Sequence, residues 1–325
     1  MSQPTVVQES PFECINEHFS TTRRLIRNAA GSIGEFSGPP TSPRINFGGL
    51  RTRGLLKNSS TNPLVTVITV VFNGEAALEE TILSVLRQTY DNIEYIVVDG
   101  GSTDGTIEIL KKYEDALDFW VSGPDAGIYD AMNKGIALAT GDWLNFLNTG
   151  DLFFADTTVA TLVDRHILPR HPNEKFFYSD VMLALGITAG RKRLVRHVCD
   201  HRRRIINHQA AIYAKELHLR YGPYLVSKGL TISDYLFFSL MDPNTFAKVD
   251  EPIAVYDVTG VSQSRRSVEQ KFIVDYLING FSRPKFIAHF FLYFYYRRTK
   301  TIGVNIRSQL TSFAESIRAK WAPRP

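Results

Sequence analysis

A run of apolar, mostly β-branched residues from Leu64 to Phe72 (LVTVITVVF) constrains the fold of this chain more than any other feature. An uninterrupted run of this kind is typical of a strand that is covered by helices on both faces. Ile93–Val98 (IEYIVV) predicts a second such strand, and between the two runs Leu78, Ile82 and Val85 recur at helical spacing. Strand, helix and strand in this order predict a right-handed parallel βαβ unit.

The same alternation continues along the chain, with a helix expected at Thr106–Tyr113, a strand at Asp118–Ser122, a helix at Tyr129–Ala139 and a strand at Trp143–Leu147. The predicted fold class is therefore α/β, with a mostly parallel, Rossmann-like sheet flanked by helices. Ligands bind such sheets beyond the carboxyl ends of the strands. Three loops rich in polar and turn residues begin at these ends, at Asn73, Asp99 and Asn148.

Composition divides the chain into three parts. Residues 1–62 lack sustained periodicity, and we expect an N-terminal extension with a short helix around Phe12–Arg27. Residues 63–265 predict the α/β domain, in which 63–155 carry the strand and helix alternation and 156–265 mix short strands with a helix near Asp234–Met241. Residues 266–325 predict a C-terminal aromatic and basic helical extension.

The charge and cysteine content exclude several classes of protein. Lys and Arg exceed Asp and Glu by 37 to 33, a margin too small to indicate a nucleic-acid-binding protein. Cys14 and Cys199 lie far apart and form no CxxC pattern, so neither a disulfide framework nor a thiolate metal site is expected. The first residues lack the basic start and apolar core of a secretory signal, and we expect a cytoplasmic protein.

The turn after the first strand excludes two common nucleotide-binding motifs. Dehydrogenases place G-x-G-x-x-G there and phosphate-loop enzymes place G-x-x-x-x-G-K-[ST], whereas this chain has Phe72-Asn73-Gly74-Glu75. A sugar-phosphate nucleotidyltransferase would also carry a Gly-rich signature with a basic residue at this turn. After the second strand, Asp99 precedes two glycines and a Ser-Thr-Asp helix start, so Asp99 is a candidate ribose or base ligand and Asp104 a candidate helix cap.

Two segments resemble family 2 glycosyltransferases of the bacterial exopolysaccharide or colanic-acid type. They are TVITVVFNGEAALEETILSVLRQTYDNIEYIVVDGGSTDGTIEIL at 66–110 and PDAGIYDAMNKGIALATGDWLNFLNTGD at 124–151. A weaker resemblance extends to about residue 265. It implies a GT-A fold and inverting transfer of a sugar from a nucleoside diphosphate sugar, UDP- or GDP-linked, to a hydroxyl of a glycan acceptor. The implied acceptor is a lipid-linked saccharide in surface polysaccharide synthesis, with 63–155 binding the donor and 156–265 the acceptor.

The resemblance also implies the residues of a donor site and a Mg²⁺ or Mn²⁺ site. In the family's acidic metal motif, Asn148 takes the first acidic position and Gly150 the second, which leaves Asp151 as the metal-binding carboxylate. Met132 stands where many relatives have Arg beside the nucleoside. For Asn148 and Asp151, roles in a turn or helix cap stay open. The implied nucleotide-sugar-binding residues are Thr69, Val71, Asn73, Asp99, Asp125 and Asn148.

Transfer to a hydroxyl needs a base, and Asp234 in Ile232-Ser233-Asp234-Tyr235-Leu236 matches the family's base position. Its position at a helix start also suits a carboxylate that interacts with the helix dipole. His208, Arg265 and Arg266 are candidates for phosphate or acceptor contacts, with a structural His and solvent-exposed arginines as the alternatives.

Two wider alternatives remain open from the sequence. The aromatic and basic stretch at 285–300 suits a contact with the inner membrane surface or a core-packed helix with a basic end, and its apolar part is too short to span a bilayer. Because Gly150 and Met132 depart from the family pattern, the chain could also be a non-catalytic donor-binding subunit of a transferase complex.

Overall fold

The computed structural model describes residues 15–27, 45–57, 62–188, 191–203, 205–257 and 265–278, with 282, 284, 287, 288 and 291. The chain divides into two compact units, Met1–Ser264 and Arg265–Pro325. The second unit contains helix α7 (Arg265–Leu277). The predicted membrane-contact stretch at 285–300 lies almost entirely outside the described residues.

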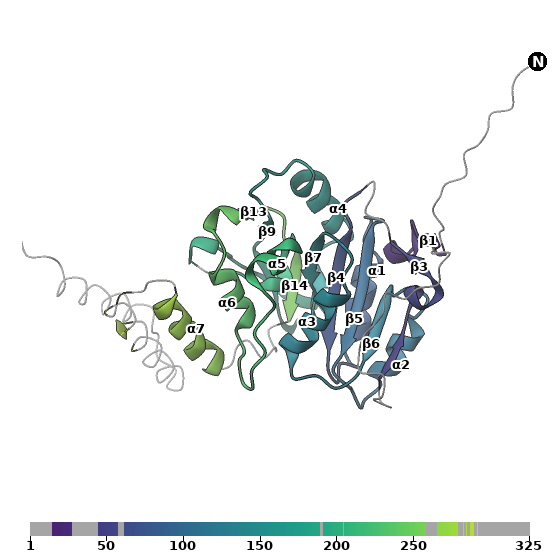
Figure 1. Cartoon of the computed structure of the whole chain (residues 1–325), viewed down its shortest axis with the longest axis horizontal. Helices are drawn as coiled ribbons and strands as arrows, with labels where there is room; N and C mark the ends of the chain where they lie inside the picture. The colour runs from purple at the N-terminus through teal and green to yellow at the C-terminus, as the bar shows by residue number, and fades with distance from the viewer. Residues whose placement is uncertain are drawn as a thin grey trace, which may run out of the picture. The chain divides into compact units, whose positions relative to one another are not determined.

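The predicted alternation of strands and helices forms the centre of the first unit. Strands β7, β4, β5 and β6 lie side by side in parallel (Figure 1), and all seven residues of β4 are buried. Helix α3 packs on β4 and β5. The sequence prediction of an α/β fold is thereby confirmed. The elements are β4 (Val65–Val71), α1 (Leu78–Leu86), β5 (Ile93–Asp99), α2 (Thr106–Lys112), β6 (Phe119–Ser122), α3 (Ile128–Leu138) and β7 (Trp143–Phe146).

Four further strands extend this sheet on both sides of its parallel centre. The order is β13-β9-β12-β7-β4-β5-β6-β2, with β12 antiparallel to β7 and β2 antiparallel to β6. The added strands are β2 (Asn46–Gly48), β9 (Phe176–Tyr178), β12 (Ala211–Ala214) and β13 (Phe246–Lys248).

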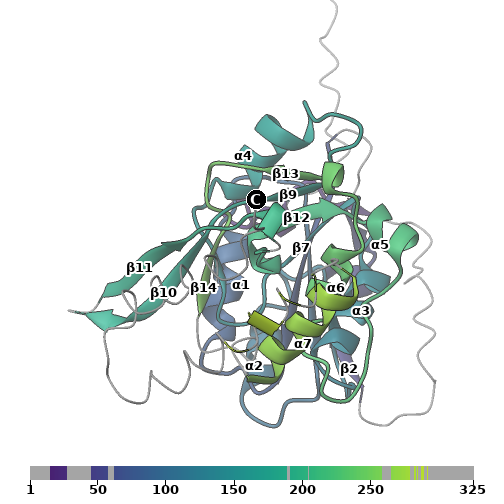
Figure 2. The ribbon, with the colours of Figure 1, turned by 90° about the vertical axis from the view of Figure 1, so that its left-hand side faces the viewer.

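A second sheet of four strands has the order β11-β10-β14-β8. Its strands are β8 (Leu152–Phe153), β10 (Val181–Thr188), β11 (Arg191–His197) and β14 (Ala254–Asp257). The hairpin of β10 and β11 projects to the left of the larger sheet in Figure 2. Because β14 pairs with both β10 and β8, this sheet joins the hairpin to the segment that follows β7.

Short helices and helical turns complete the first unit. Helix α6 confirms the helix expected near Asp234–Met241. No helix of the described residues is long and apolar enough to cross a membrane. The helical elements not yet given are α4 (Thr158–Leu162), a π-helical turn (Val163–Ile167), α5 (Glu216–Tyr221), α6 (Ser233–Ser239) and 3₁₀ turns at Ser20–Thr22, Leu50–Arg53, His201–Arg203, His208–Ala210 and Pro243–Thr245.

The N-terminal segment differs from the expected helix around Phe12–Arg27. Its described part, residues 15–27, contains a 3₁₀ turn and the short strand β1 (Ile26–Arg27), which pairs with β3 (Leu55–Leu56). The side chains in the turn bond to the domain instead of to their own helix, since the hydroxyl of Ser20 donates to the carbonyl oxygen of Val85 at 3.0 Å. A contact with helix α1 therefore takes the place of local helix formation.

A buried ion pair joins another part of the N-terminal extension, around Arg51, to the sheet. The guanidinium of Arg51 pairs with the carboxylate of Glu94, whose side chain is 1% exposed. Burial raises the pKa of Glu94, but Arg51 and hydrogen bonds from Thr140 and Thr66 outweigh burial and hold it below its ordinary value. Glu94 is therefore a charged group inside the domain that depends on a partner from the N-terminal segment.

Candidate active site

A cleft of about 830 Å³ opens beyond the carboxyl ends of the parallel strands, where the fold predicts a ligand site. Its walls come from the loops that follow β4 and β7, the first turn of α3, the His208–Ala210 turn and the start of α6. Tyr256 of β14 adds to the lining, so both sheets contribute to the cleft.

Four side chains from different elements form a hydrogen-bonded chain in this cleft. The hydroxyl of Tyr129 donates to Oδ1 of Asp234 at 2.7 Å, and Oδ2 of Asp234 lies 2.8 Å from Nδ1 of His208. Nε2 of His208 lies 3.0 Å from Nδ2 of Asn148. When Nδ1 carries the hydrogen, His208 donates to the carboxylate and accepts from the Asn148 amide. Three predicted site residues are thus brought together with one that the sequence did not single out.

The local structure explains how Tyr129 and Asp234 come to face each other. Gly127 adopts a φ of 112°, which favours glycine, and turns the chain into α3, so that Tyr129 is the second residue of that helix. Asp234 is the second residue of α6. Burial, together with the Asp234 carboxylate, raises the pKa of Tyr129 well above its ordinary value. Tyr129 therefore remains protonated and is a fixed hydrogen-bond donor to Asp234.

The turn at Asn148–Asp151 is built around a glycine and held by helix α1. Gly150 has a φ of 95°, and the amide of Asp151 donates to the carbonyl oxygen of Asn148 at 2.9 Å. The hydroxyl of Thr81 accepts from the amide of Gly150 and donates to the carbonyl oxygen of Asp151, each at 3.0 Å. An L-amino acid at position 150 would be strained in this conformation, which accounts for a glycine at the position where the family resemblance implied an acidic residue.

The same turn offers oxygen atoms that suit a hard divalent cation. Asp151 lines the cleft and is 3% exposed, and the buried Oδ1 of Asn148 has no hydrogen-bond partner. Mg²⁺ and Mn²⁺ take oxygen ligands and complete their coordination with water and substrate phosphates. Within the described residues, no three His, Cys, Asp or Glu side chains cluster as a complete metal site. These residues therefore fit a cation that a diphosphate helps to bind.

The loops after β4 and β5 are joined by side-chain hydrogen bonds. Asn73 has a φ of 50°. Its side-chain Oδ1 accepts from the backbone amide of Thr103 at 2.9 Å, and its backbone amide donates to the hydroxyl of Ser102 at 2.7 Å. Asp99 accepts from the amides of Gly101 and Ser102 and from both Ser102 and Ser122 hydroxyls. Asp99 thus holds the shape of its loop. Asn73 is part of the cleft wall, whereas Asp99 is not.

The comparison with known proteins agrees with this geometry. Residues 66–171 match the model of the family described as "Glycosyl transferase family 2". A protein of Mycobacterium tuberculosis named "Uncharacterized glycosyltransferase Rv1514c" is 32% identical over 212 residues, which are 62% of this chain and 78% of that protein. The chain belongs to glycosyltransferase family 2. It is accordingly a transferase enzyme.

Other matches are consistent with this family. The "PGL/p-HBAD biosynthesis glycosyltransferase" of Mycobacterium bovis is 33% identical over 174 residues, 50% of this chain and 63% of that protein. The crystal structure of Staphylococcus aureus TarS 1-349 in complex with UDP-GlcNAc aligns with a TM-score of 0.51 and 20% identity, over 66% of this chain and 65% of that one. The transferase has the GT-A fold that the sequence implied.

The remaining predicted site residues take different places. Val71 and Asp125 line the cleft, and Asp125 accepts from the amide of Gly127 at 2.8 Å. Thr69 is buried and does not line the cleft, since its hydroxyl donates to the carbonyl oxygen of Leu147 at 2.7 Å. Arg265 and Arg266 belong to the second compact unit, on α7.

Met132, the second departure from the family pattern, lines the cleft and is 1% exposed. Lys134, the nearest basic residue along the chain, donates to the carbonyl oxygen of Pro124 and pairs with Asp130, each at 3.0 Å. Lys134 is not among the residues of the cleft wall, and its contacts instead hold the start of α3.

Sequence reasoning missed several residues of the cleft wall, chiefly Tyr129 and Tyr256. Phe72 is the last residue of the apolar run Leu64–Phe72, and its side chain is nevertheless 67% exposed at the cleft wall. Tyr129 gave no signal in the sequence, because its partner Asp234 is 105 residues away in the chain.

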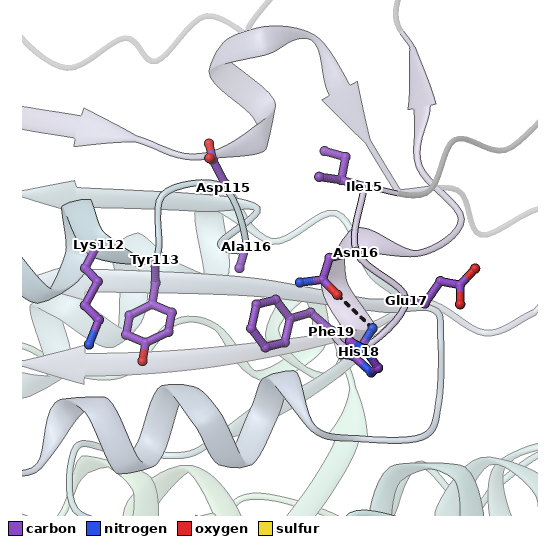
Figure 3. Close-up of a pocket in the computed structure, with 9 residues that line it drawn as sticks. All are labelled: Ile15, Asn16, Glu17, His18, Phe19, Lys112, Tyr113, Asp115 and Ala116. Carbon is purple, nitrogen blue, oxygen red and sulfur yellow. Dashed lines mark hydrogen bonds between the residues drawn. The ribbon is translucent and has the colours of Figure 1, made fainter.

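A second pocket, of about 570 Å³, lies between residues 15–19 and the end of α2 (Figure 3). Phe19 and Asn16 line it from one side and Tyr113 and Ala116 from the other. It contains none of the predicted site residues, and the chemistry of the transferase is therefore assigned to the cleft.

Proposed function

We propose that this transferase moves a sugar, with inversion, from a nucleoside diphosphate sugar to a hydroxyl of a glycan acceptor, with Asp234 as the base. The observation that carries this proposal is the position of the Asp234 carboxylate, which lies in the cleft and has a hydrogen-bond partner on each oxygen. A fixed carboxylate at the acceptor side of a donor cleft is suited to removing the proton of an attacking hydroxyl.

In the proposed reaction the acceptor oxygen attacks the anomeric carbon while the bond from that carbon to the diphosphate breaks. The hydroxyl proton passes to Asp234. Tyr129 keeps its own proton and, with His208, holds the carboxylate in one orientation. Prior orientation of the base lowers the entropic part of the barrier.

We place the donor against the loops after β4, β5 and β7. Val71, Asn73 and Asp125 line this part of the cleft, and the exposed ring of Phe72 offers a surface on which a base can stack. Asp99 and Thr69 support these loops from behind, and UDP or GDP is the proposed nucleotide.

We propose Mg²⁺ or Mn²⁺ as the cofactor, with Asp151 and Asn148 as its protein ligands. A bound cation would neutralise charge that develops on the departing diphosphate. Asp151 supplies a carboxylate, and the turn clamped by Thr81 keeps it at the cleft wall.

The proposed acceptor is a lipid-linked saccharide in surface polysaccharide assembly, on the cytoplasmic side of the membrane. Family membership and the relatives named as glycosyltransferases support an acceptor that receives a sugar. The alternative of a non-catalytic subunit was based on two departures from the family pattern, Gly150 and Met132. The positive φ of Gly150 gives a conformational reason for the first of them.

The test is thermal unfolding with UDP, GDP, ADP or TDP, each with and without Mn²⁺, in the wild type, Asp151→Ala and Asp234→Asn. A ligand that binds the folded protein raises its melting temperature. We expect one nucleotide to stabilise the protein only with Mn²⁺, an effect lost in Asp151→Ala and kept in Asp234→Asn. With the preferred UDP- or GDP-sugar, Asp234→Asn should lower transfer by about 10²–10⁴-fold. Stabilisation by no nucleotide would contradict the donor site.

A further inference from the structure

Tyr224 is a buried aromatic residue that lies next to the hydrogen-bonded chain of the cleft. It belongs to the loop between α5 and α6, is 2% exposed and is not part of the cleft wall. Its ring packs against the ring of Tyr129, with 5.7 Å between the ring centroids. Because the Tyr129 hydroxyl donates to Asp234 at 2.7 Å, a single side chain separates Tyr224 from that carboxylate. Tyr224 therefore contacts the chain from behind, where it does not touch a substrate in the cleft.

The side chain of Asn133 holds the backbone of Tyr224 from helix α3. Its Nδ2 donates to the carbonyl oxygen of Tyr224 at 2.8 Å, and its Oδ1 accepts from the backbone amide of Tyr224 at 2.9 Å. Asn133 follows Tyr129 by four residues, so the two side chains lie on the same face of α3. The loop that contains Tyr224 is thereby fixed to the helix that carries Tyr129.

A directed chain of hydrogen bonds holds the other end of the Tyr224 side chain. The hydroxyls of Tyr224 and Tyr213 lie 3.0 Å apart, and the Tyr213 hydroxyl lies 3.0 Å from Nε2 of His218. Nδ1 of His218 lies 3.1 Å from the carbonyl oxygen of Gly222, which can only accept, so Nδ1 carries the hydrogen. Burial lowers the pKa of His218 to about 4, so the ring is neutral and Nε2 accepts from Tyr213. The Tyr213 hydroxyl in turn accepts from Tyr224, which gives the Tyr224 hydroxyl a defined partner.

Tyr224 also contacts the helix that carries the proposed base. Its ring lies 5.3 Å from the ring of Phe237 on α6, measured between centroids. Tyr129 is the second residue of α3, and Asp234 is the second residue of α6. The fixed ring of Tyr224 therefore packs against both helices whose first turns supply the hydrogen bond between Tyr129 and Asp234.

We propose that Tyr224 is a positioning residue for the transfer reaction and acts on Asp234 through Tyr129. Its ring, held by Asn133 and Tyr213, limits movement of the Tyr129 ring, and the Tyr129 hydroxyl then keeps Oδ1 of Asp234 in one place. Correct placement of a reacting group lowers the barrier, and small displacements of that group are costly in rate. The inference rests on the proposed role of Asp234 as the base.

The experiment compares transfer by full-length variants, measured as release of UDP or GDP from the UDP- or GDP-sugar that the wild type uses, with octyl glycosides as acceptor probes. Tyr224→Leu removes the ring, and Tyr224→Phe keeps the ring but removes the hydroxyl. Tyr178→Leu is the matched control, since Tyr178 is also 2% exposed, does not line the cleft and bonds to His201 instead. Asn133→Ala removes the clamp without changing a ring, and it carries the test if Tyr224→Leu does not fold.

We expect Tyr224→Leu and Asn133→Ala to lower kcat by about tenfold to a hundredfold, while the KM for the donor and the nucleotide thermal shift change little. Tyr224→Phe, which keeps the contact with the Tyr129 ring, should lose less than Tyr224→Leu. The control Tyr178→Leu should keep nearly the kcat of the wild type. Equal losses of kcat in Tyr224→Leu and Tyr178→Leu would overturn the proposal, because general loosening of the core would then explain both.

A double variant tests whether Tyr224 acts through Tyr129. Once Tyr129→Phe has removed the hydrogen bond to Asp234, adding Tyr224→Leu should lower kcat little further, since both substitutions act on one contact. Fully additive losses would overturn the proposal. Asp234→Asn separates this inference from the proposed function: full transfer by Asp234→Asn would remove the base itself, whereas loss of transfer in Asp234→Asn with an unchanged kcat in Tyr224→Leu would remove only the role of Tyr224.

Discussion

His208 and Asp234 are joined by a 2.8 Å contact between Nδ1 and Oδ2, and Tyr129 holds the other oxygen of the same carboxylate. Their side chains are only partly exposed, at 12% for His208 and 20% for Asp234. A carboxylate held on both oxygens cannot rotate freely, yet it remains open to the cleft. The pair therefore combines a fixed direction with access for an acceptor.

His208→Ala should lower turnover while leaving donor binding nearly unchanged. A hydrogen bond to a charged group contributes about 1.5–3 kcal/mol, which corresponds to roughly 10- to 150-fold in rate if it acts on the base. Steady-state kinetics with saturating donor, together with the nucleotide thermal shift, measure the two effects. If donor affinity fell as much as turnover, His208 would be a donor ligand instead of a residue that positions Asp234.

Thr81→Val should loosen the turn that carries Asp151. The substitution keeps the shape of the side chain but leaves the amide of Gly150 and the carbonyl oxygen of Asp151 without their partner. We expect a loss of about 1–3 kcal/mol in the free energy of unfolding and weaker Mn²⁺-dependent nucleotide binding. Urea denaturation and Mn²⁺ titration check this, and Thr81→Ser, which keeps the hydroxyl, is the matched control. Equal Mn²⁺ dependence in both variants would argue against the clamp.

Gly150→Asp should not improve metal binding, even though it restores the acidic residue that the family motif implies. At a φ of 95° a side chain costs about 1–3 kcal/mol, and relief of that strain would move Asp151. Gly150→Ala serves as the control for backbone strain alone. Denaturation and Mn²⁺ titration of both variants give the answer, and tighter Mn²⁺ binding by Gly150→Asp than by the wild type would refute this account of the glycine.

Arg51→Ala should strongly destabilise the domain, although Arg51 does not line the cleft. It leaves the charge of Glu94 buried without its ion-pair partner, a change that costs about 3–5 kcal/mol. The double substitution Arg51→Met with Glu94→Gln removes both charges and should recover much of this loss. Chemical denaturation at neutral pH tests both variants.

The effect of Arg51→Ala should shrink in acid. The lowered pKa of Glu94 means that its contribution is present above its unfolded pKa of about 4.3 and is lost as the pH falls through the folded pKa. Without Arg51 the carboxyl becomes protonated in the folded state at higher pH. The stability difference from the wild type should therefore be largest near neutral pH, and a difference independent of pH would contradict the ion-pair explanation.

The parallel centre of the fold could be predicted because β4 and β5 are continuous apolar runs with a helical spacing between them. The contacts of the N-terminal residues could not be predicted. Strand β2 has only three residues, and it pairs with β6, which lies more than 70 residues later in the chain. Asp234, His208 and Asn148 were each candidates from the sequence, but their hydrogen-bonded chain with Tyr129 consists of tertiary contacts that no local pattern encodes. The roles proposed for Asp234, Asp151 and the donor loops remain predictions until the variants are measured.

Strand β2 and Arg51 lie before residue 66, where the family match begins. A fragment cut at that point would leave the backbone of β6 as an open edge, ready to pair with another molecule, and Glu94 as an uncompensated charge. The boundary of the recognisable family sequence is thus not the boundary of the folding unit. A stable version of the domain should therefore include the residues from upstream of position 45, because they complete the edge of the sheet and supply the partner of Glu94.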